Sequence, residues 1–274
     1  MQISIIIPIY NKIEIIYDCI KFNISHCVHT HEWIVIDNGS DVQTKDGLSN
    51  LQSYATSLGH TFIIHTETYN TGVAKAWNKG LSMANAANVL ILNNDCVLMP
   101  AWDVAITSTL TTYSHHIISP MVIEPEWYSG YTLEDFLNGK INYQKILKIN
   151  NKRTITTYFG GVAIAGSKTL FDTVGEFDEN FWLLLEDYDY LMRAKKAGIN
   201  PIIDCSVAGY HYTSLTRKDM HQTFDKNYTY FHQKWGFDFQ KVDNNFSNKL
   251  HRSLKKKLFK WFAWYHQKIT LPAV

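Results

Sequence analysis

The chain has 274 residues, of which 46% are hydrophobic and 14% aromatic, a composition typical of one large globular domain with a full core. The formal net charge of +1 at pH 7 is unevenly distributed, because residues 244–274 hold seven basic residues and no acid. Residues 1–243 hold the other 19 basic residues against 25 acidic ones. The four cysteines form no CxxC pair, which excludes a zinc ribbon and a dithiol redox motif and predicts a reducing compartment.

The start of the chain carries no recognisable targeting signal. Met1 is followed almost at once by a predicted strand, so we expect no signal peptide. No stretch approaches the roughly 20 apolar residues that cross a bilayer. The sequence therefore predicts a cytoplasmic protein.

The first third of the chain is predicted to alternate strands with helices. Strands are expected at Ile3–Ile9, Trp33–Ile36, Thr61–His65 and Val89–Leu92, and helices at Lys12–Ser25, 44–58 and Ala74–Ala86. The first strand is a nearly unbroken β-branched run, typical of a central parallel strand, and we expect Pro8 to end it. This alternation predicts βαβ units and a doubly wound α/β sheet.

Polar residues follow each of these strands. The four strand ends read Pro8-Ile9-Tyr10-Asn11, Asp37-Asn38-Gly39-Ser40, Tyr69-Asn70-Thr71-Gly72 and Asn93-Asn94-Asp95. Ligands of doubly wound sheets bind beyond the carboxyl ends of the strands, so these segments predict a shared pocket. Neither GxGxxG nor GxxxxGKS occurs, which excludes both of those phosphate cradles. An acidic rim would repel a phosphate ligand unless a metal were present, and Asp95 is placed to bind Mg²⁺ or Mn²⁺.

The second half of the chain shows fewer signals. Thr154–Ala165 is predicted to be a strand broken by Gly160-Gly161, where the backbone can approach a ligand closely. Another strand is expected at Pro201–Cys205, leading to His211. The region between residues 100 and 158 is poorly patterned.

Three carboxylates lie within four positions at Glu186, Asp187 and Asp189, directly after an apolar run. Such a cluster is stable when a cation or a reacting proton balances the repulsion between its charges. The alternative is an acidic first turn of a helix, which the helix dipole stabilises. The helix is expected to end near Gly198.

Taken together, these motifs resemble one family. In order and spacing, the chain is similar over about residues 2–236 to the inverting, nucleotide-sugar-dependent glycosyltransferases of family 2. The matching segments are Ile5–Asn11, Val35–Ser40, Asn70–Ala74, Trp77–Gly80, Leu92–Asp95, Gly175–Glu179, Glu186–Asp189 with Arg193 and Gly198, His211 and Lys234–Gly236.

The resemblance implies a GT-A type, Rossmann-like, doubly wound mixed sheet with helices on both faces and a C-terminal helical extension. The catalytic domain would span residues 1–240, with a nucleotide-binding half at 1–98 and an acceptor-binding half at 99–240. Residues 241–274 would form a basic, amphipathic helical tail.

The resemblance also implies roles for individual residues. Those implied to bind the nucleotide-diphosphate sugar are Pro8, Ile9, Tyr10, Asn11, Asp37, Asn38, Asn70, Gly72, Ala74, Asn78, Asn93, Asn94 and Arg193. Among them, Pro8 and Tyr10 would border the nucleotide base, and Asp37 would hydrogen-bond a base edge. The implied acceptor-binding residues are Gly160, Gly161 and Trp182.

Asp95 stands at the final position of the family's DxD-type motif and would bind Mn²⁺ or Mg²⁺. Asn93 and Asn94 leave only one carboxylate in this motif, a departure from the family pattern. His211 matches the imidazole that completes the metal site. Packing among Tyr210 and Tyr212 is the structural alternative for this histidine.

Asp187 matches the general base that would remove the proton of the acceptor hydroxyl as the new bond forms. Glu186 and Asp189 are the alternative bases, or they position the acceptor or cap the helix. Arg193 would pair with these carboxylates or with phosphate, or would form a structural ion pair.

The expected function is therefore transfer of a sugar, with inversion, to a hydroxyl of a surface glycan or a lipid-linked glycan precursor. The alternatives are transfer to modified DNA or protein, and a non-catalytic nucleotide-sugar or carbohydrate-binding protein. Residues 249–269 show lysines around an apolar stripe, which indicates peripheral contact with the inner face of a membrane. Docking of this helix on its own domain and contact with nucleic acid, for which no motif is present, remain the other interpretations.

Overall fold

The computed structural model describes residues 3–123, 154–156, 158–212 and 221–236. The chain divides into two compact units, residues 1–220 and 221–274, which are considered separately. The predicted boundary at residue 240 and the predicted basic tail lie outside the described residues and stay predictions.

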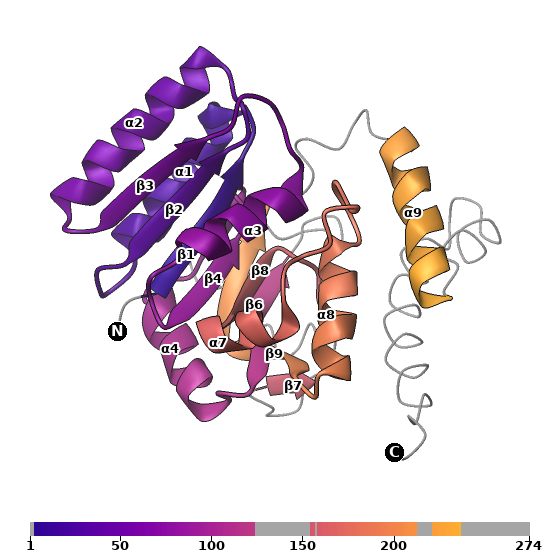
Figure 1. Cartoon of the computed structure of the whole chain (residues 1–274). Helices are drawn as coiled ribbons and strands as arrows, with labels where there is room; N and C mark the ends of the chain where they lie inside the picture. The colour runs from indigo at the N-terminus through magenta and orange to yellow at the C-terminus, as the bar shows by residue number, and fades with distance from the viewer. Residues whose placement is uncertain (1–2, 124–153, 157, 213–220, 237–274) are drawn as a thin grey trace, which may run out of the picture. The chain divides into compact units, whose positions relative to one another are not determined.

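The first unit is built on a nine-stranded mixed sheet (Figure 1). The strands are β1 (Ile3–Ile9), β2 (Glu32–Asp37), β3 (Thr61–Thr66), β4 (Asn88–Leu92), β5 (Cys96–Leu98), β6 (His116–Ile123), β7 (Thr154–Thr156), β8 (Ala163–Ser167) and β9 (Asn200–His211). Their order is β3-β2-β1-β4-β8-β6-β9-β5, and β7 pairs with β9. β1 to β4 are parallel to one another and β8 is antiparallel to β4, which confirms the predicted mixed α/β sheet.

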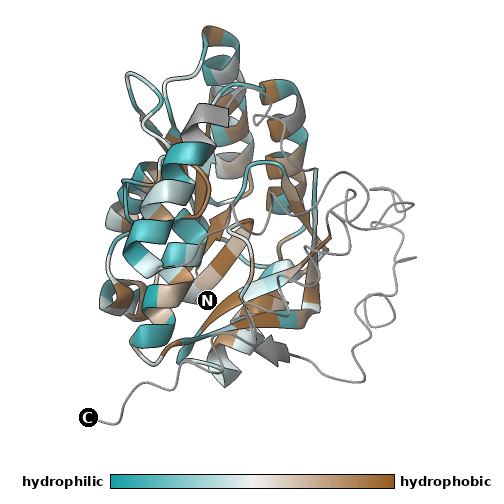
Figure 2. Ribbon diagram, turned by 90° about the vertical axis from the view of Figure 1, so that its right-hand side faces the viewer, coloured by the Kyte–Doolittle hydropathy of each residue, from teal (hydrophilic) through white to brown (hydrophobic). Residues whose placement is uncertain are grey.

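Helices cover both faces of the sheet. The helices are α1 (Ile13–Ser25), α2 (Val42–Ser57), α3 (Val73–Met83), α4 (Trp102–Thr112), α7 (Lys168–Val174) and α8 (Glu186–Lys196). Alternate residues of β1, from Ile3 to Ile9, share one buried cluster with the apolar sides of α1, α2 and α4. The aromatic rings of Trp77, Phe177 and Tyr190 join α3 to α8 on the other face. Figure 2 shows the hydrophobic colour concentrated on the strands, with hydrophilic residues on the helices.

The expectation that Pro8 ends the first strand is wrong, because β1 continues to Ile9 and pairs Pro8 with Ile36 of β2. Proline lacks an N–H and is tolerated where no ladder bond is lost. The pairing of β1 with β4 has already ended at Ile6, and the Pro8 carbonyl accepts a hydrogen bond from the side chain of Asn94 instead.

Thr154–Ala165 is not one strand interrupted by glycines, as predicted, but two strands with different neighbours. β7 pairs with β9, whereas β8 lies between β4 and β6. β9 also extends well beyond the predicted Cys205, because its second half pairs with β5 and β6. Such pairing depends on distant segments and leaves no local period in the sequence.

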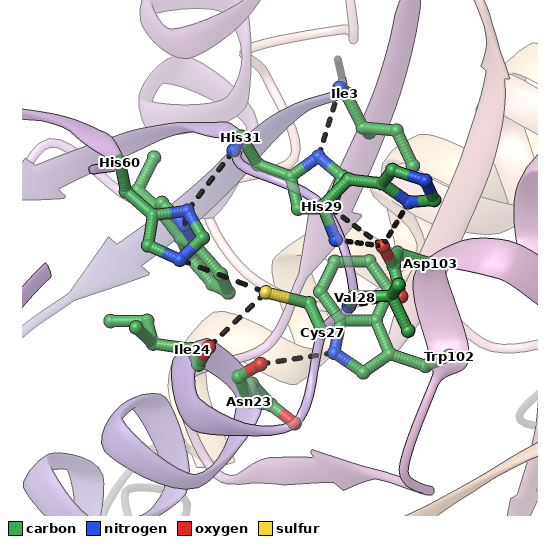
Figure 3. A network of polar contacts seen from close by, with 11 residues as sticks. Ile3, Asn23, Ile24, Cys27, Val28, His29, His31, His60, Trp102 and Asp103 are labelled. Carbon is green, nitrogen blue, oxygen red and sulfur yellow. Dashed lines mark hydrogen bonds and ion pairs between the residues drawn. The ribbon is translucent and has the colours of Figure 1, made fainter. Parts of the chain in front are cut away.

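A network of histidines around Asp103 links the amino ends of β1 to β3 (Figure 3). Because these strands are parallel, their amino ends lie at the edge opposite the predicted pocket. The buried Asp103 carboxylate accepts hydrogen bonds from the Val28 and His29 N–H groups at 2.9 Å each and contacts the rings of His29 and His31 at 3.0 and 3.1 Å. His31 Nδ1 also accepts the Ile3 N–H at 3.3 Å. With both ring nitrogens occupied in this way, His31 is held as the neutral tautomer protonated on Nε2.

This network makes folding stability depend on pH. Burial lowers the pKa of His31 from 6.5 to about 4, and burial also lowers the pKa of His60, whose Nδ1 accepts the N–H of His31. Because the unfolded chain binds these protons first, stability falls as the pH drops below about 6.5, by about 2 kcal/mol from His31 between pH 7.5 and pH 5. Urea unfolding at the two pH values should show this loss. His31→Gln should reduce this loss of unfolding free energy, whereas His115→Gln, at an exposed position, should leave it as in the wild type. A free energy of unfolding that does not change between the two pH values would contradict a buried, neutral His31.

The described part of the second unit is helix α9 (His221–Trp235). Within it, the rings of Phe231 and Trp235 lie 6.4 Å apart between centroids. Among the described helices of both units, none is long and apolar enough to cross a membrane. All four cysteines lie in the described residues and are free thiols.

Candidate active site

The carboxyl ends of the parallel strands are tied together by hydrogen bonds. The Asn38 N–H donates to the Ile9 carbonyl at 2.8 Å, and its side-chain amide donates to the Gly72 carbonyl at 3.2 Å. Asn94 donates to the Pro8 carbonyl at 2.8 Å. The four predicted polar segments therefore meet along one edge of the sheet.

Asp37 lies fully buried at this edge. Its Oδ1 accepts the Ser40 N–H at 2.9 Å, while its Oδ2 is buried without a hydrogen-bond partner in the described structure. A buried polar atom left unpaired costs free energy, about 1–3 kcal/mol in mutational data. A ligand that donates an N–H to Oδ2 would recover this cost.

Asp95 and His211 are brought together from distant segments. β5 and β9 pair Cys96 with His211, which places the His211 Nε2 3.0 Å from Asp95 Oδ1. Both residues are more than nine-tenths buried. The structural alternative for His211, packing between Tyr210 and Tyr212, does not account for this contact. Burial raises the pKa of the neighbouring Tyr212 to about 12, so its hydroxyl stays neutral.

One carboxylate and one imidazole are chemically suited to share a divalent cation. No group of three or more His, Cys, Asp or Glu side chains in the described ranges could hold a metal alone. The remaining ligands would have to come from a bound diphosphate and water, which is usual for Mg²⁺-type sites. Asp95 and His211 therefore fit a metal that binds together with its ligand.

Asp187 lies in the first turn of α8 and faces the turn before β8. The Gly161 N–H donates to Asp187 Oδ2 at 2.6 Å, and the Tyr188 N–H donates to Oδ1 at 2.8 Å. The carboxylate is half-buried and held at both oxygens. The acidic-helix-start interpretation is correct for its location, since Glu186, Asp187 and Asp189 all lie in the first turn.

The same turn connects the two acidic segments. Directly after Gly161, the Val162 carbonyl accepts the Asn93 N–H at 2.8 Å. Asn93 begins the Asn93-Asn94-Asp95 segment, so one turn is bonded to Asp187 on one side and to the Asp95 segment on the other. Two signals that are about ninety residues apart in the sequence therefore lie at one sheet edge.

The loop before α8 is held against the start of α3. The Val73 N–H donates to the Trp182 carbonyl at 2.8 Å, and a Cβ on Gly72 would lie only 2.5 Å from that carbonyl oxygen. Gly72, at φ 88°, is therefore required for this approach. Leu184 and Leu185 then adopt positive φ values of 78° and 73°, which is uncommon for branched side chains and typical of functional loops.

The side chains of several predicted site residues form hydrogen bonds or ion pairs within the protein. Asn78 bonds the Phe177 backbone through both ends of its amide. Arg193 pairs with the buried Asp189 at 2.9 Å and donates to two backbone carbonyls, so the structural ion pair is formed. These contacts favour positioning roles for the three residues, and their direct roles in binding or catalysis stay predictions.

The other predicted residues follow the same division. Ile9 and Ala74 have buried side chains, whereas Tyr10 is 39% exposed at the end of β1. The Asn11 side chain accepts the N–H of Asp41 in the loop after β2, and the Asn70 side chain accepts the N–H of Gly72 within its own turn. Their roles in donor binding also stay predictions.

The family is decided by the sequence match. A sequence model described as "Glycosyl transferase family 2" matches residues 4–175. The chain belongs to glycosyltransferase family 2. The family 2 match includes β1, the Asp37 and Asp95 segments and the turn at Gly161, and it ends before Asp187.

Individual proteins resemble parts of the chain. The glycosyltransferase AglE of Haloferax volcanii is 25% identical over 211 residues, covering 76% of this chain and 66% of AglE. A PGL/p-HBAD biosynthesis glycosyltransferase of Mycobacterium bovis is 33% identical over 98 residues, covering 36% of this chain and 37% of that protein. The chain thus spans less than two thirds of these curated relatives.

Solved structures share the fold at low sequence identity. The mannosyltransferase PcManGT of Pyrobaculum calidifontis, solved with GDP-Man and Mn²⁺, aligns over 84% of this chain and 62% of its own at a TM-score of 0.61 and 18% identity. GalNAc-T7, solved with UDP, GalNAc and Mn²⁺, aligns over 98% of this chain and 57% of its own, with a TM-score of 0.68 and 13% sequence identity. These likenesses confirm the expected GT-A type fold.

Proposed function

We propose that this family 2 protein transfers a sugar from a nucleotide-diphosphate donor to an acceptor hydroxyl, with inversion at the anomeric carbon. The observation that carries the proposal is the turn at Gly161-Val162, which bonds Asp187 on one side and the Asp95 segment on the other. An inverting transfer needs a base and a diphosphate site within one sugar's reach of each other, because the acceptor attacks from the face opposite the leaving diphosphate, and the turn supports this by joining the two segments.

The donor would bind along the carboxyl ends of β1 to β4. Asp37 Oδ2 would accept an N–H from the base, and this hydrogen bond would offset the cost of burying the oxygen without a partner. Tyr10, exposed beside it in the sheet order, would border the base. The mannosyltransferase and GalNAc-T7 structures contain nucleotides of GDP and UDP type, and both bases carry such an N–H.

Asp95 and His211 would hold the metal against the diphosphate. When bound, Mn²⁺ or Mg²⁺ supplies Lewis-acid stabilisation of the charge that develops on the leaving diphosphate. The imidazole of His211 favours Mn²⁺, since Mg²⁺ takes mainly oxygen ligands. Both structural relatives were solved with Mn²⁺.

Asp187 would act as the general base. Its two oxygens are fixed by backbone N–H groups, so the carboxylate is oriented before the acceptor arrives. A positioned base contributes about 10²–10⁴-fold to such a reaction. Glu186, which is buried, and Asp189, which is paired with Arg193, are less accessible to an acceptor.

For the acceptor we propose a glycan or a lipid-linked glycan precursor, as in polysaccharide biosynthesis. Gly160, Gly161 and Trp182 adjoin the Asp187 side of the site through the turn before β8 and the loop before α8. A cytoplasmic enzyme acting at the inner membrane face would meet such an acceptor. Residues 249–269, which would mediate that contact, lie outside the described residues.

The proposal is tested by incubating the purified chain with a panel of UDP, GDP and TDP sugars and measuring nucleotide release with Mn²⁺, Mg²⁺ or EDTA. We expect release from donors of one base class, supported best by Mn²⁺ and abolished by EDTA. Binding of a nucleotide sugar without release under any of these conditions would instead favour a non-catalytic binding protein.

A further inference from the structure

At the proposed base, Gly161 lies against the ring of Trp77, a residue to which no role has been given. A Cβ on Gly161 would lie 2.7 Å from Cη2 of Trp77, 3.0 Å from Asp187 Cβ and 3.2 Å from Asp187 Oδ2. Real Cβ atoms essentially never approach other atoms within 3.0 Å. The indole ring, the carboxylate and the glycine therefore occupy one tightly filled space.

We propose that Gly161 and Trp77 are positioning residues for Asp187. This inference rests on the proposed function. The Gly161 N–H fixes Oδ2 at 2.6 Å, and the indole ring closes the space so that only hydrogen fits on the α-carbon of residue 161.

Trp77 is held rigidly enough to play this part. It is 1% exposed within α3, and its ring packs edge-on to Phe177 with centroids 4.8 Å apart. The Phe177 ring in turn stacks on the ring of Tyr190 in α8, with centroids 4.0 Å apart. Tyr190 lies three residues after Asp187 on the same helix. The ring thus has little freedom to move away from an added methyl group.

The neighbouring glycine provides a matched comparison. Among the described residues, a Cβ on Gly160 would have only Asp187 Oδ2 nearby, at 3.9 Å, which is ordinary van der Waals contact. Gly160→Ala adds the same methyl group one position earlier without displacing the carboxylate. Any kcat loss in Gly160→Ala should therefore be clearly smaller than that in Gly161→Ala.

The experiment is a double-mutant cycle on kcat for nucleotide-sugar turnover. Gly161→Ala alone should lower kcat about 100-fold, because a misplacement of about 1 Å in a catalytic group has effects of that size. The KM for the donor should change less than about threefold, since donor groups lie on the other side of the turn. In an Asp187→Asn background, Gly161→Ala should lower kcat less than about threefold further, because residues that act as one unit are not additive.

Multiplicative effects in the cycle would show that Gly161 acts independently of Asp187 and would overturn the inference, as would a kcat for Gly161→Ala within about threefold of wild type. Thermal melts report whether the variants fold. If Gly161→Ala does not fold, the same cycle with Trp77→Phe decides: sub-multiplicative losses support the coupling and multiplicative losses refute it. Absence of turnover in the wild type would instead refute the proposed function.

Discussion

Asp187→Asn should reduce kcat about 1,000-fold while changing the donor KM less than about threefold, because a general base acts only as the acceptor loses its proton. The amide is nearly isosteric, and its oxygen can still accept the Gly161 N–H, so the turn should stay in place although the bond from the Tyr188 N–H is lost. The change can be measured as nucleotide release at saturating donor and acceptor.

The matched comparison is Asp189→Asn, two residues along the same helix. Asp189 is fully buried and its Oδ2 pairs with Arg193, so this substitution should lower the melting temperature more than Asp187→Asn does. Its kcat loss should stay below about tenfold. A larger kcat loss for Asp189→Asn than for Asp187→Asn would transfer the role of base to Asp189.

Asp95→Asn should lower kcat about 100-fold at fixed Mn²⁺ and raise the Mn²⁺ concentration needed for half-maximal rate, because it removes the charged ligand at the diphosphate. Two asparagines already precede this residue, so Asp95 is the only carboxylate of the segment. Rates measured over a range of Mn²⁺ concentrations give both effects, and electron paramagnetic resonance determines the free Mn²⁺ concentration in each sample.

His211→Asn tests the other half of the metal pair. Because the imidazole contributes a neutral ligand, its removal should raise the Mn²⁺ requirement less than Asp95→Asn does and should narrow the preference for Mn²⁺ over Mg²⁺. An unchanged Mn²⁺ dependence in both variants would refute the metal site.

The sequence predicted the parts of the fold that depend on local pattern. The apolar runs and the polar residues that follow them predicted β1 to β4, because buried parallel strands have nearly continuous apolar sequences. The end of each such strand lies at the same edge, so Asp37 and Asp95 could be placed together without coordinates. The contact between Asp95 and His211 was expected only from the family resemblance, because the pairing of β5 with β9 that forms it leaves no local signal.

The support around Asp187 could not be predicted in the same way. Gly160-Gly161 indicated a close backbone approach, but the sequence does not say which group approaches. Trp77 lies in a segment that resembles the family. Its closeness to the α-carbon of Gly161, however, follows only from the packing of α3 against the turn. Asp103 was also missed, because one buried carboxylate that accepts several donors has no spacing motif.

We propose that Asp95 and Asp187 flank the donor sugar from opposite sides. The most direct measurement of this arrangement is a crystal structure of the Asp187→Asn variant with Mn²⁺ and the nucleotide sugar selected by the release assay. We expect Mn²⁺ to be bound to Asp95 and His211, with the anomeric carbon between the diphosphate and the side chain of residue 187. A donor bound with residue 187 on the diphosphate side, or with Mn²⁺ away from Asp95, would contradict this arrangement.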